Sequence, residues 1–333
     1  MKKTWIKWLE DIWYKEMYLS SMFMPLSMLY VDIIRVRRFL YQIGVFKTTK
    51  IPAPVIVIGN ITVGGTGKTP LVIWLAEQLI AHGYQPGVIS RGYAGSQTDS
   101  PQIVKSNSDP SLVGDEAVLL ARRCHCPVVV AKKRVEAARE LLANFPCNVI
   151  ISDDGLQHLA LFRDIEIVVI DGLRRFGNGY CLPVGPLREP QERVKRVDFV
   201  VVNGADELEA NEIAMTCQGN DVINLQTGEK KLLADFKTAK LHAIAAIGNP
   251  QRFFSMLKSA GFDIDEHAFQ DHYDFKAEDL YFKDDNPVLM TEKDAVKCRK
   301  FAQAKHWYLP IDAKLPESFS QKLLKLLQEK SHG

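Results

Sequence analysis

Short apolar runs rich in β-branched residues alternate along much of the chain with amphipathic helical patterns. The runs that predict strands occupy residues 55–58, 87–90, 127–131, 148–152, 165–171 and 198–203. Between them, residues 70–82 and 115–124 have the spacing of amphipathic helices. Strands that are continuously apolar and separated by helices are typical of a parallel sheet covered on both faces. The pattern therefore predicts an α/β domain.

A second, shorter series of the same kind follows. Its strand-like runs occupy residues 241–247, 287–291 and 307–310, and its helical patterns occupy residues 251–260 and 293–304. Residues 206–240 are polar and weakly patterned, and we interpret them as the connection between the two series. A chain of 333 residues is long enough for two domains. We predict a core over 47–230 and a smaller α/β domain over 231–333.

The first 46 residues have a different pattern. One face of a predicted helix carries the apolar residues Trp5, Trp8, Leu9, Ile12 and Trp13. An uncharged stretch over 17–31 follows; it is too short to span a bilayer and contains Pro25. A basic cluster of Arg35, Arg37 and Arg38 comes next. This order is typical of an interfacial membrane anchor, but a terminal helix packed on its own domain explains it equally well.

Composition and charge narrow the class of protein. The chain is 47% hydrophobic and 25% charged, as in ordinary globular enzymes. Its net charge of +2 lacks the basic excess of a general nucleic-acid binder. The six cysteines form no paired CxxC units, which predicts a reduced environment. Cys124, His125 and Cys126 have no second pair of ligands, so we interpret them as structural residues rather than a zinc site.

The strongest motif follows the first apolar run: TVGGTGKTP (62–70), then a helical pattern. Glycines allow backbone N–H groups to surround phosphate oxygens, while Lys68 neutralises phosphate charge and Thr69 offers a hydroxyl to Mg²⁺. The usual pattern, GxxxxGK[ST], requires glycine where this chain has Thr62. Flexibility comes instead from three other glycines, Gly64, Gly65 and Gly67. We predict a nucleotide phosphate site here.

A second motif ends the apolar run at 148–152 with Asp153 and Asp154. In P-loop enzymes an acidic residue at this place organises Mg²⁺. A simple Asp-Asp-Gly turn is the alternative, but the phosphate loop favours the metal interpretation. Two further segments, SRGY (90–93) and PVGPLREP (183–190), are ambiguous by themselves. In GDE (114–116), Asp115 is most simply a helix N-cap when taken alone.

Together the motifs resemble the tetraacyldisaccharide 4′-kinase family, the lipid A 4′-kinases of Gram-negative bacteria. The motifs run in family order along nearly the whole chain: TVGGTGKTP (62–70), SRGY (90–93), GDE (114–116), DDGLQH (153–158), PVGPLREP (183–190), AIGNPQRF (246–253), FQDHYDF (269–275) and TEKDAVK (291–297). The resemblance implies a P-loop NTPase-like parallel-sheet core, a second, smaller α/β domain and N-terminal membrane-associated helices.

The resemblance also implies an activity. The enzyme would use ATP and Mg²⁺ to phosphorylate the 4′-hydroxyl of a tetraacyldisaccharide 1-phosphate. The product would be lipid IVA, made at the cytoplasmic face of the bacterial inner membrane. The enzyme would be peripheral or monotopic there. The lipid substrate and inner-membrane lipids are the expected partners, and neither nucleic acid nor a protein partner is indicated.

The same resemblance implies roles for individual residues. Asp115 would be the catalytic base, and His272 its partner. The residues expected to bind ATP are Thr62, Val63, Gly64, Gly65, Thr66, Gly67, Lys68 and Thr69. Those expected around Mg²⁺ are Thr69, Asp153, Asp154, Gln157 and Glu189. Those expected near substrate or phosphate are Arg91, Tyr93, Glu116, Arg134 and Arg188.

Two other classes of protein share part of this pattern. A P-loop GTPase or a metal-insertion nucleotide hydrolase would also have a phosphate loop and an acidic strand end. Residues 201–204 do not supply the Asn/Thr-Lys-x-Asp motif that recognises guanine. The other class is a membrane-bound module that only senses nucleotide. We predict the kinase because the site motifs and the family resemblance agree.

Overall fold

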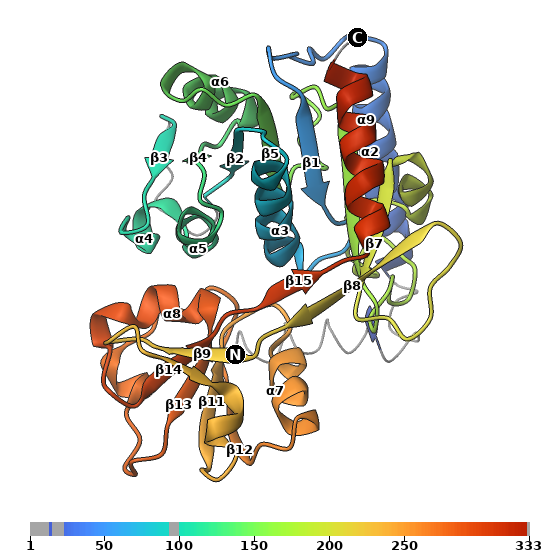
Figure 1. The fold of residues 1–333 in the computed structure, drawn as a ribbon. Coiled ribbons are helices and arrows are strands. Elements are labelled where there is room, and N and C mark those ends of the chain that lie inside the picture. Colours follow the sequence, from blue (N-terminus) through green and yellow to red (C-terminus); the bar gives the residue numbers. More distant parts are fainter. Residues whose placement is uncertain (1–12, 15–22, 93–99, 332–333) are drawn as a thin grey trace.

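Two β-sheets organise the chain into a larger and a smaller domain, as Figure 1 shows. This computed structural model describes residues 13–14, 23–92 and 100–331. The chain crosses from the large sheet to the small one after strand β8 (Glu212–Gln218) and returns before strand β15 (Asp312–Lys314). Both crossings lie at the same junction between the domains.

The large sheet has nine strands in the order β15-β8-β7-β6-β1-β5-β2-β4-β3. Besides β8 and β15, its strands are β1 (Val55–Gly59), β2 (Pro86–Ser90), β3 (Gln102–Val104), β4 (Val128–Val130), β5 (Val149–Asp153), β6 (Ile165–Asp171) and β7 (Phe199–Asn203). Only the two edge strands, β3 and β15, run antiparallel to their neighbours. The predicted α/β class is confirmed for this domain.

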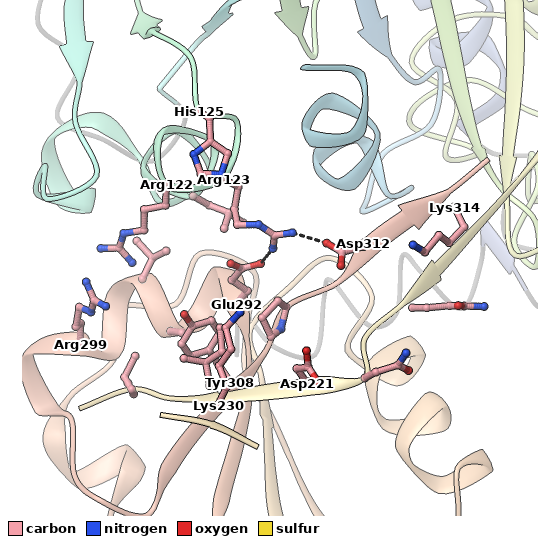
Figure 2. Close-up of a pocket in the computed structure, with 18 residues that line it drawn as sticks. Arg122, Arg123, His125, Asp221, Lys230, Glu292, Arg299, Tyr308, Asp312 and Lys314 are labelled. Carbon is pink, nitrogen blue, oxygen red and sulfur yellow. Dashed lines mark hydrogen bonds and ion pairs between the residues drawn. The ribbon is translucent and has the colours of Figure 1, made fainter. Parts of the chain in front are cut away.

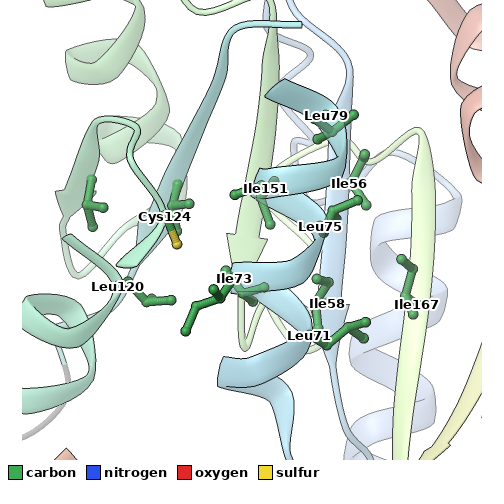
Figure 3. Packing of buried hydrophobic residues seen from close by; sticks show 14 of the residues in the cluster. Ile56, Ile58, Leu71, Ile73, Leu75, Leu79, Leu120, Cys124, Ile151 and Ile167 are labelled. Atoms are coloured by element: carbon green, nitrogen blue, oxygen red, sulfur yellow. The ribbon is translucent and has the colours of Figure 1, made fainter. Parts of the chain in front are cut away.

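Helices cover both faces of this sheet because its strands are apolar on both sides. They are α2 (Met24–Gln42), α3 (Lys68–Ala81), α4 (Pro110–Val113), α5 (Asp115–Arg123), α6 (Arg134–Asn144) and α9 (Glu317–Ser331). Figure 3 shows Leu71, Leu75 and Leu79 of α3 packed over Ile56 and Ile58 of β1. All five side chains are fully buried. Burial of one such side chain contributes about 1.5 to 3 kcal/mol, so α3 is held firmly behind the loop that precedes it.

The small sheet has six strands in the order β10-β9-β14-β13-β11-β12. Its strands are β9 (Asp221–Asn224), β10 (Lys230–Leu232), β11 (Leu241–Ala245), β12 (Ile264–Ala268), β13 (Val288–Thr291) and β14 (His306–Leu309). The helices of this domain are α7 (Pro250–Ser259) and α8 (Glu292–Cys298). Short 3-10 turns complete the chain at Gln191–Arg196, Leu233–Phe236, Ala277–Leu280 and Arg299–Phe301. Strands β11 to β14 are parallel, which confirms the second α/β unit.

The predicted domain limits need two corrections. Residues 206–240 are not a connection, because they contain β8, β9 and β10. The C-terminal residues 312–331 belong to the large domain rather than the small one. The ring of Phe319 on α9 stacks on Trp74 of α3, with 5.4 Å between centroids. Short edge strands and a returning helix depend on distant partners, so local patterning gives them only a weak signal.

The N-terminal region is described only in part. Trp5, Trp8, Leu9 and Ile12 lie outside the described residues, as do residues 17–22 of the uncharged stretch. The rest of that stretch forms the first half of α2, with Pro25 in its first turn. Among the described helices, none combines the length and the apolar character needed to cross a bilayer.

Candidate active site

The predicted phosphate loop connects β1 to α3 at a switch point of the large sheet. Strand β1 lies between β5 and β6, and ligands of open α/β sheets bind where the strand order reverses in this way. Gly64 and Gly67 have φ values of 98° and 94°, a left-handed conformation that favours glycine. A Cβ atom at Gly67 would lie 2.1 Å from Nδ2 of Asn203. The loop therefore requires glycine at this position.

Lys68 and the loop threonines are partly or fully buried. The Lys68 Nζ atom donates to Oδ1 of Asn60 at 3.2 Å and lies 3.4 Å from Oδ1 of Asp154. Thr62 and Thr66 are buried, and the Thr66 hydroxyl has no hydrogen-bond partner among the described residues. Thr69 lies in the first turn of α3. The loop thus presents a lysine, unpaired hydrogen-bonding capacity and a helix N-terminus, which suit phosphate oxygens.

Two carboxylates stand at the end of β5, next to this loop. Asp153 is 2% exposed, and its Oδ2 atom accepts a hydrogen bond from Ser90 at 3.1 Å. Burial, together with the charges of Glu116 and Asp154, raises the pKa of Asp153 to about 6. Burial also opposes ionisation of Asp154, but Lys68 and Arg188 hold its pKa at about 2. At the end of this strand, Asp154 is therefore readily ionised, whereas ionisation of Asp153 is unfavourable.

The remaining residues predicted around Mg²⁺ are bonded to each other. Gln157 Nε2 donates to Glu189 Oε1 at 2.8 Å. Oε2 of Glu189 lies 3.2 Å from Arg38 of α2 and 3.6 Å from Arg193. Within the described part of the chain, no three histidine, cysteine or acidic side chains form a ready metal site. Magnesium suits such a partial site, because it is usually bound through one or two carboxylates, waters and substrate phosphates.

The predicted basic contacts are placed differently from one another. Arg188 is 3.2 Å from Asp154, beside the phosphate loop. The Arg134 guanidinium is buried and donates to the backbone oxygen of Asp153 at 3.0 Å, so it braces the strand end. Arg91 follows β2 with an exposed side chain, and Tyr93 lies outside the described residues.

Asp115 and His272 meet across the two domains. Nδ1 of His272 is 3.1 Å from both carboxylate oxygens of Asp115. Burial opposes the charge of Asp115, but the hydrogen bond from His272 and the charge of Lys293 keep its pKa below the usual value. Burial likewise opposes the His272 charge, but Asp115 raises its pKa. The pair therefore favours an ionised carboxylate beside a protonated imidazole.

Sequence reasoning missed two lysines of α8 that lie at this pair. Lys293 Nζ is 2.9 Å from Glu116 and 3.1 Å from Asp271. Lys297 Nζ is 3.8 Å from Asp115 and 3.0 Å from Asp294. The available signal was the TEKDAVK motif itself, in which two lysines four residues apart share one face of a helix. Both lysines come from the small domain, so they complete the site only when the domains meet.

A glycine-rich loop at the switch point, a lysine on its phosphate site and a buried carboxylate nearby define the P-loop class of phosphoryl-transfer proteins. Comparisons with known proteins agree with this class. Residues 19–328 match the family described as Tetraacyldisaccharide-1-P 4′-kinase. The chain belongs to that family, and the predicted resemblance is confirmed.

Individual relatives cover nearly the whole chain. The Tetraacyldisaccharide 4′-kinase of Nitrosococcus oceani is 54% identical over 317 residues, which are 95% of this chain and 93% of that protein. The protein of the same name from Methylobacillus flagellatus is 46% identical over 97% of each chain. A crystal structure of LpxK from Aquifex aeolicus in complex with ATP superposes with a TM-score of 0.79 at 29% identity; it covers 93% of this chain and 100% of that one.

Proposed function

We propose that this protein transfers the γ-phosphoryl group of ATP to the 4′-hydroxyl of a tetraacyldisaccharide 1-phosphate, giving lipid IVA. The observation that carries the proposal is the Asp115–His272 pair, which joins the two domains; Glu116, the next residue, acts electrostatically on Asp153 at the strand end beside Lys68 and Asp154. A sugar hydroxyl needs a base within hydrogen-bond reach as it attacks phosphorus. Asp115 is buried and ionised, as that role requires.

The loop residues suit ATP, and the donor set suits Mg²⁺. Thr62 to Thr69 would hold the phosphates, with Lys68 on the transferred group. Oxygen donors alone, from Thr69 and the two acids that end β5, form the hard site that Mg²⁺ prefers. Asp153 supports this fit, since burial beside Glu116 and Asp154 makes its charge costly and a divalent cation would offset that cost. When bound, the metal would neutralise charge on the β and γ oxygens.

The chain's own groups then account for the proton. Asp115 accepts the proton of the 4′-hydroxyl while the hydroxyl oxygen forms a bond to the γ-phosphorus. The bond between the γ-phosphorus and the β-phosphate oxygen breaks at the same time, which releases ADP. His272 orients Asp115 through Nδ1 and compensates its charge before the transfer. Lys68 and Arg188 remain paired with phosphate or with Asp154 throughout the transfer. Their positive charges therefore stay close to the negative charge that shifts between the phosphate oxygens.

The test is direct phosphorylation of the lipid. Full-length protein, ATP, Mg²⁺ and tetraacyldisaccharide 1-phosphate are mixed in detergent, and mass spectrometry follows the addition of one phosphoryl group. Lys68→Ala should lose nearly all of this activity, whereas Lys105→Ala, an exposed lysine, should retain it. Phosphorylation by Lys68→Ala at the normal rate would show that the loop does not hold the reacting phosphates.

Membrane binding by α2 is part of the same proposal. Leu26, Leu29, Ile33 and Val36 are each more than half exposed and lie on one face of this helix. The opposite face is tied to the site: Tyr30 donates to the backbone oxygen of Arg188 at 3.1 Å. A contiguous exposed apolar face of this kind marks an interaction surface. An α2 helix lying on the inner membrane would bring the site to a substrate whose acyl chains stay in the bilayer.

A further inference from the structure

A second cavity lies at the junction between the domains, away from the residues proposed for catalysis. Its volume is about 460 Å³, and Figure 2 shows it between the last turns of α5 on one side and α8, β9 and β14 on the other. Both chain crossings border it, through Gln218 and Asn220 on one and Pro310 and Asp312 on the other. We call this cavity the hinge pocket. A ligand that fills it would touch both domains and both crossings.

The lining of the hinge pocket is rich in positive charge. The cations are Arg122, Arg123, Lys230, Arg299 and Lys314, and the carboxylates are Asp221, Glu292 and Asp312. Arg123, on α5 of the large domain, pairs with Glu292 of the small domain and with Asp312 of its own domain. The five cations outnumber the three carboxylates, and the other four cations form no ion pair with a carboxylate among the described residues, although the charge of Glu292 also acts on Arg122.

Two of those cations oppose each other. Figure 2 shows the guanidinium groups of Arg122, on α5, and Arg299, which follows α8, pointing toward one another. Nε of Arg122 donates to the backbone oxygen of Ser106 at 2.8 Å. Across the described ranges of the chain, neither arginine forms an ion pair with a carboxylate. Burial and the charge of Arg299 both lower the pKa of Arg122, as expected when like charges meet at a half-buried interface.

We propose that the hinge pocket is a regulatory site for a small soluble anion bearing a phosphate or diphosphate group, held between Arg122 and Arg299. Two planar guanidinium groups from opposite sides match the oxygens of a phosphate group. The rest of the lining, including Leu119, Val296 and Tyr308, offers apolar and aromatic surface to an organic part of the ligand. A bound anion would replace the repulsion between Arg122 and Arg299 with an attraction of both guanidinium groups to one ligand, which links the two domains.

The bridge is linked to the catalytic pair by two packed helices. Helix α5 begins at Asp115 and reaches Arg122 two turns later, roughly 10 Å along its axis. It packs against α8, which carries Lys293 and Lys297 and is followed by Arg299. An anion that holds the distal ends of these helices together favours the arrangement in which His272 meets Asp115. Binding at the hinge pocket therefore promotes closure of the site.

Calorimetric titration with inorganic pyrophosphate tests the proposal. Two sites are expected in the wild-type protein, since the phosphate loop also binds the probe. Lys68→Gln should remove one site, while Arg122→Gln or Arg299→Gln should weaken the other at least tenfold. Arg139→Gln, an exposed arginine on α6, is the matched control and should change neither. A single site that is lost in Lys68→Gln, or unchanged titration of both hinge-pocket variants, would overturn the proposal.

Closure of the domains is followed separately by hydrogen exchange in the Lys68→Gln variant. In that variant pyrophosphate no longer binds to the phosphate loop, so any protection comes from the hinge pocket. Pyrophosphate should slow exchange of the amides of α5 and α8 in that variant. It should not do so when Arg299→Gln is added. Because Arg122 also contacts Ser106, the Arg299 variant decides the outcome if Arg122→Gln fails to fold. Protection by pyrophosphate that persists without Arg299 would contradict the assignment, as would protection by anionic vesicles and not by soluble pyrophosphate.

Discussion

Asp115 is an acid whose environment suits a base that acts at neutral pH. Its carboxylate is 3% exposed, yet His272 and the α8 lysines keep it ionised. An isolated buried carboxylate would instead take up a proton. The histidine that prevents this comes from the other domain, so the chemistry of this one residue depends on how the domains meet.

We expect Asp115→Asn to lower kcat by about 10² to 10⁴-fold with little change in the KM for ATP, because the amide cannot accept the proton. His272→Gln should lower kcat less, since the base survives without its orienting partner. The two effects should be less than additive in the double variant. Steady-state kinetics on the lipid substrate measures all three. Loss of ATP binding in Asp115→Asn would instead make Asp115 a structural cap or a metal ligand.

In contrast to Asp115, Asp153 has a pKa above the usual value of an aspartate, and the stability of the folded protein should therefore depend on pH. Its folded-state pKa of about 6 lies above the ordinary 3.8, so the folded protein loses stability as the pH rises from about 4 through 6. Asp153→Asn removes that loss and should stabilise the protein by about 1 to 3 kcal/mol at pH 7, while abolishing activity. Below pH 4 the two proteins should be equally stable. Denaturant unfolding at both pH values measures the difference, and a destabilised variant at pH 7 would refute the prediction.

At the scale of elements, helix α2 has an inner face that contacts the rest of the protein and an outer face that is exposed. Its inner face is held by Ser27, Tyr30 and Arg38, which bond to the segment 181–189. Its outer face is apolar without a partner among the described residues. A helix that needed only to pack would expose polar residues there.

Charge placed on the outer face of α2 should therefore detach the protein from membranes. We expect the triple variant Leu29→Glu, Ile33→Glu and Val36→Glu to lose most of its sedimentation with anionic vesicles, because burial of three carboxylates in lipid is costly. Its activity on detergent-solubilised substrate should remain. Leu232→Glu with Tyr281→Glu, exposed apolar positions of the small domain, is the control. Unchanged sedimentation of the triple variant would remove the anchor hypothesis.

The return of α9 to the large domain has a measurable consequence. Phe319 is 1% exposed, and its ring contacts both Trp74 and Phe199 of that domain. Phe319→Ala should destabilise the large domain by about 3 to 5 kcal/mol through the lost burial and the cavity left behind. Thermal unfolding measures this, and Tyr281→Ala, which is 67% exposed, should shift the melting temperature little. Equal melting temperatures for the two variants would mean that α9 does not stabilise the core.

At the scale of the whole molecule, the site is divided between domains that meet through charged residues. Lys293 forms one of these links, since its amine contacts Glu116 of the large domain and Asp271 of its own. The Lys293 side chain is only 13% exposed, and its removal would leave the carboxylates of Glu116 and Asp271 without this cation. The relative position of the domains is therefore sensitive to this one side chain.

Lys293→Met should lower kcat at least tenfold without loss of secondary structure, because His272 would no longer be held against Asp115. Lys293→Arg should restore part of the activity by restoring the charge. Kinetics with circular dichroism as the folding check tests both, and Lys283→Met, an exposed lysine of the small domain, is the control. Full activity of Lys293→Met would show that the domains meet without this link.

Local features of the sequence were enough to predict the central strands β1, β2, β4, β5, β6 and β7 of the large sheet and β11, β13 and β14 of the small one, together with the phosphate loop and the acidic strand end. These features depend on neighbours in the chain: apolar runs define buried strands, and the loop glycines and Lys68 act within a few residues of each other. The motifs in family order also singled out Asp115 and His272 before their contact was known. Their separation of 157 residues leaves no local sign of that contact.

Tertiary structure alone decided which distant groups meet. It placed β8, β9, β10 and α9, whose short or half-exposed patterns depend on partners far along the chain. It turned Arg134 toward a backbone oxygen, and it brought Lys293 and Lys297 to Asp115 and Glu116. It also set Arg122 against Arg299 at the hinge pocket. The physical reason is the same in each case: burial and charge depend on distance in space, and spacing along the chain does not encode the distance between two domains.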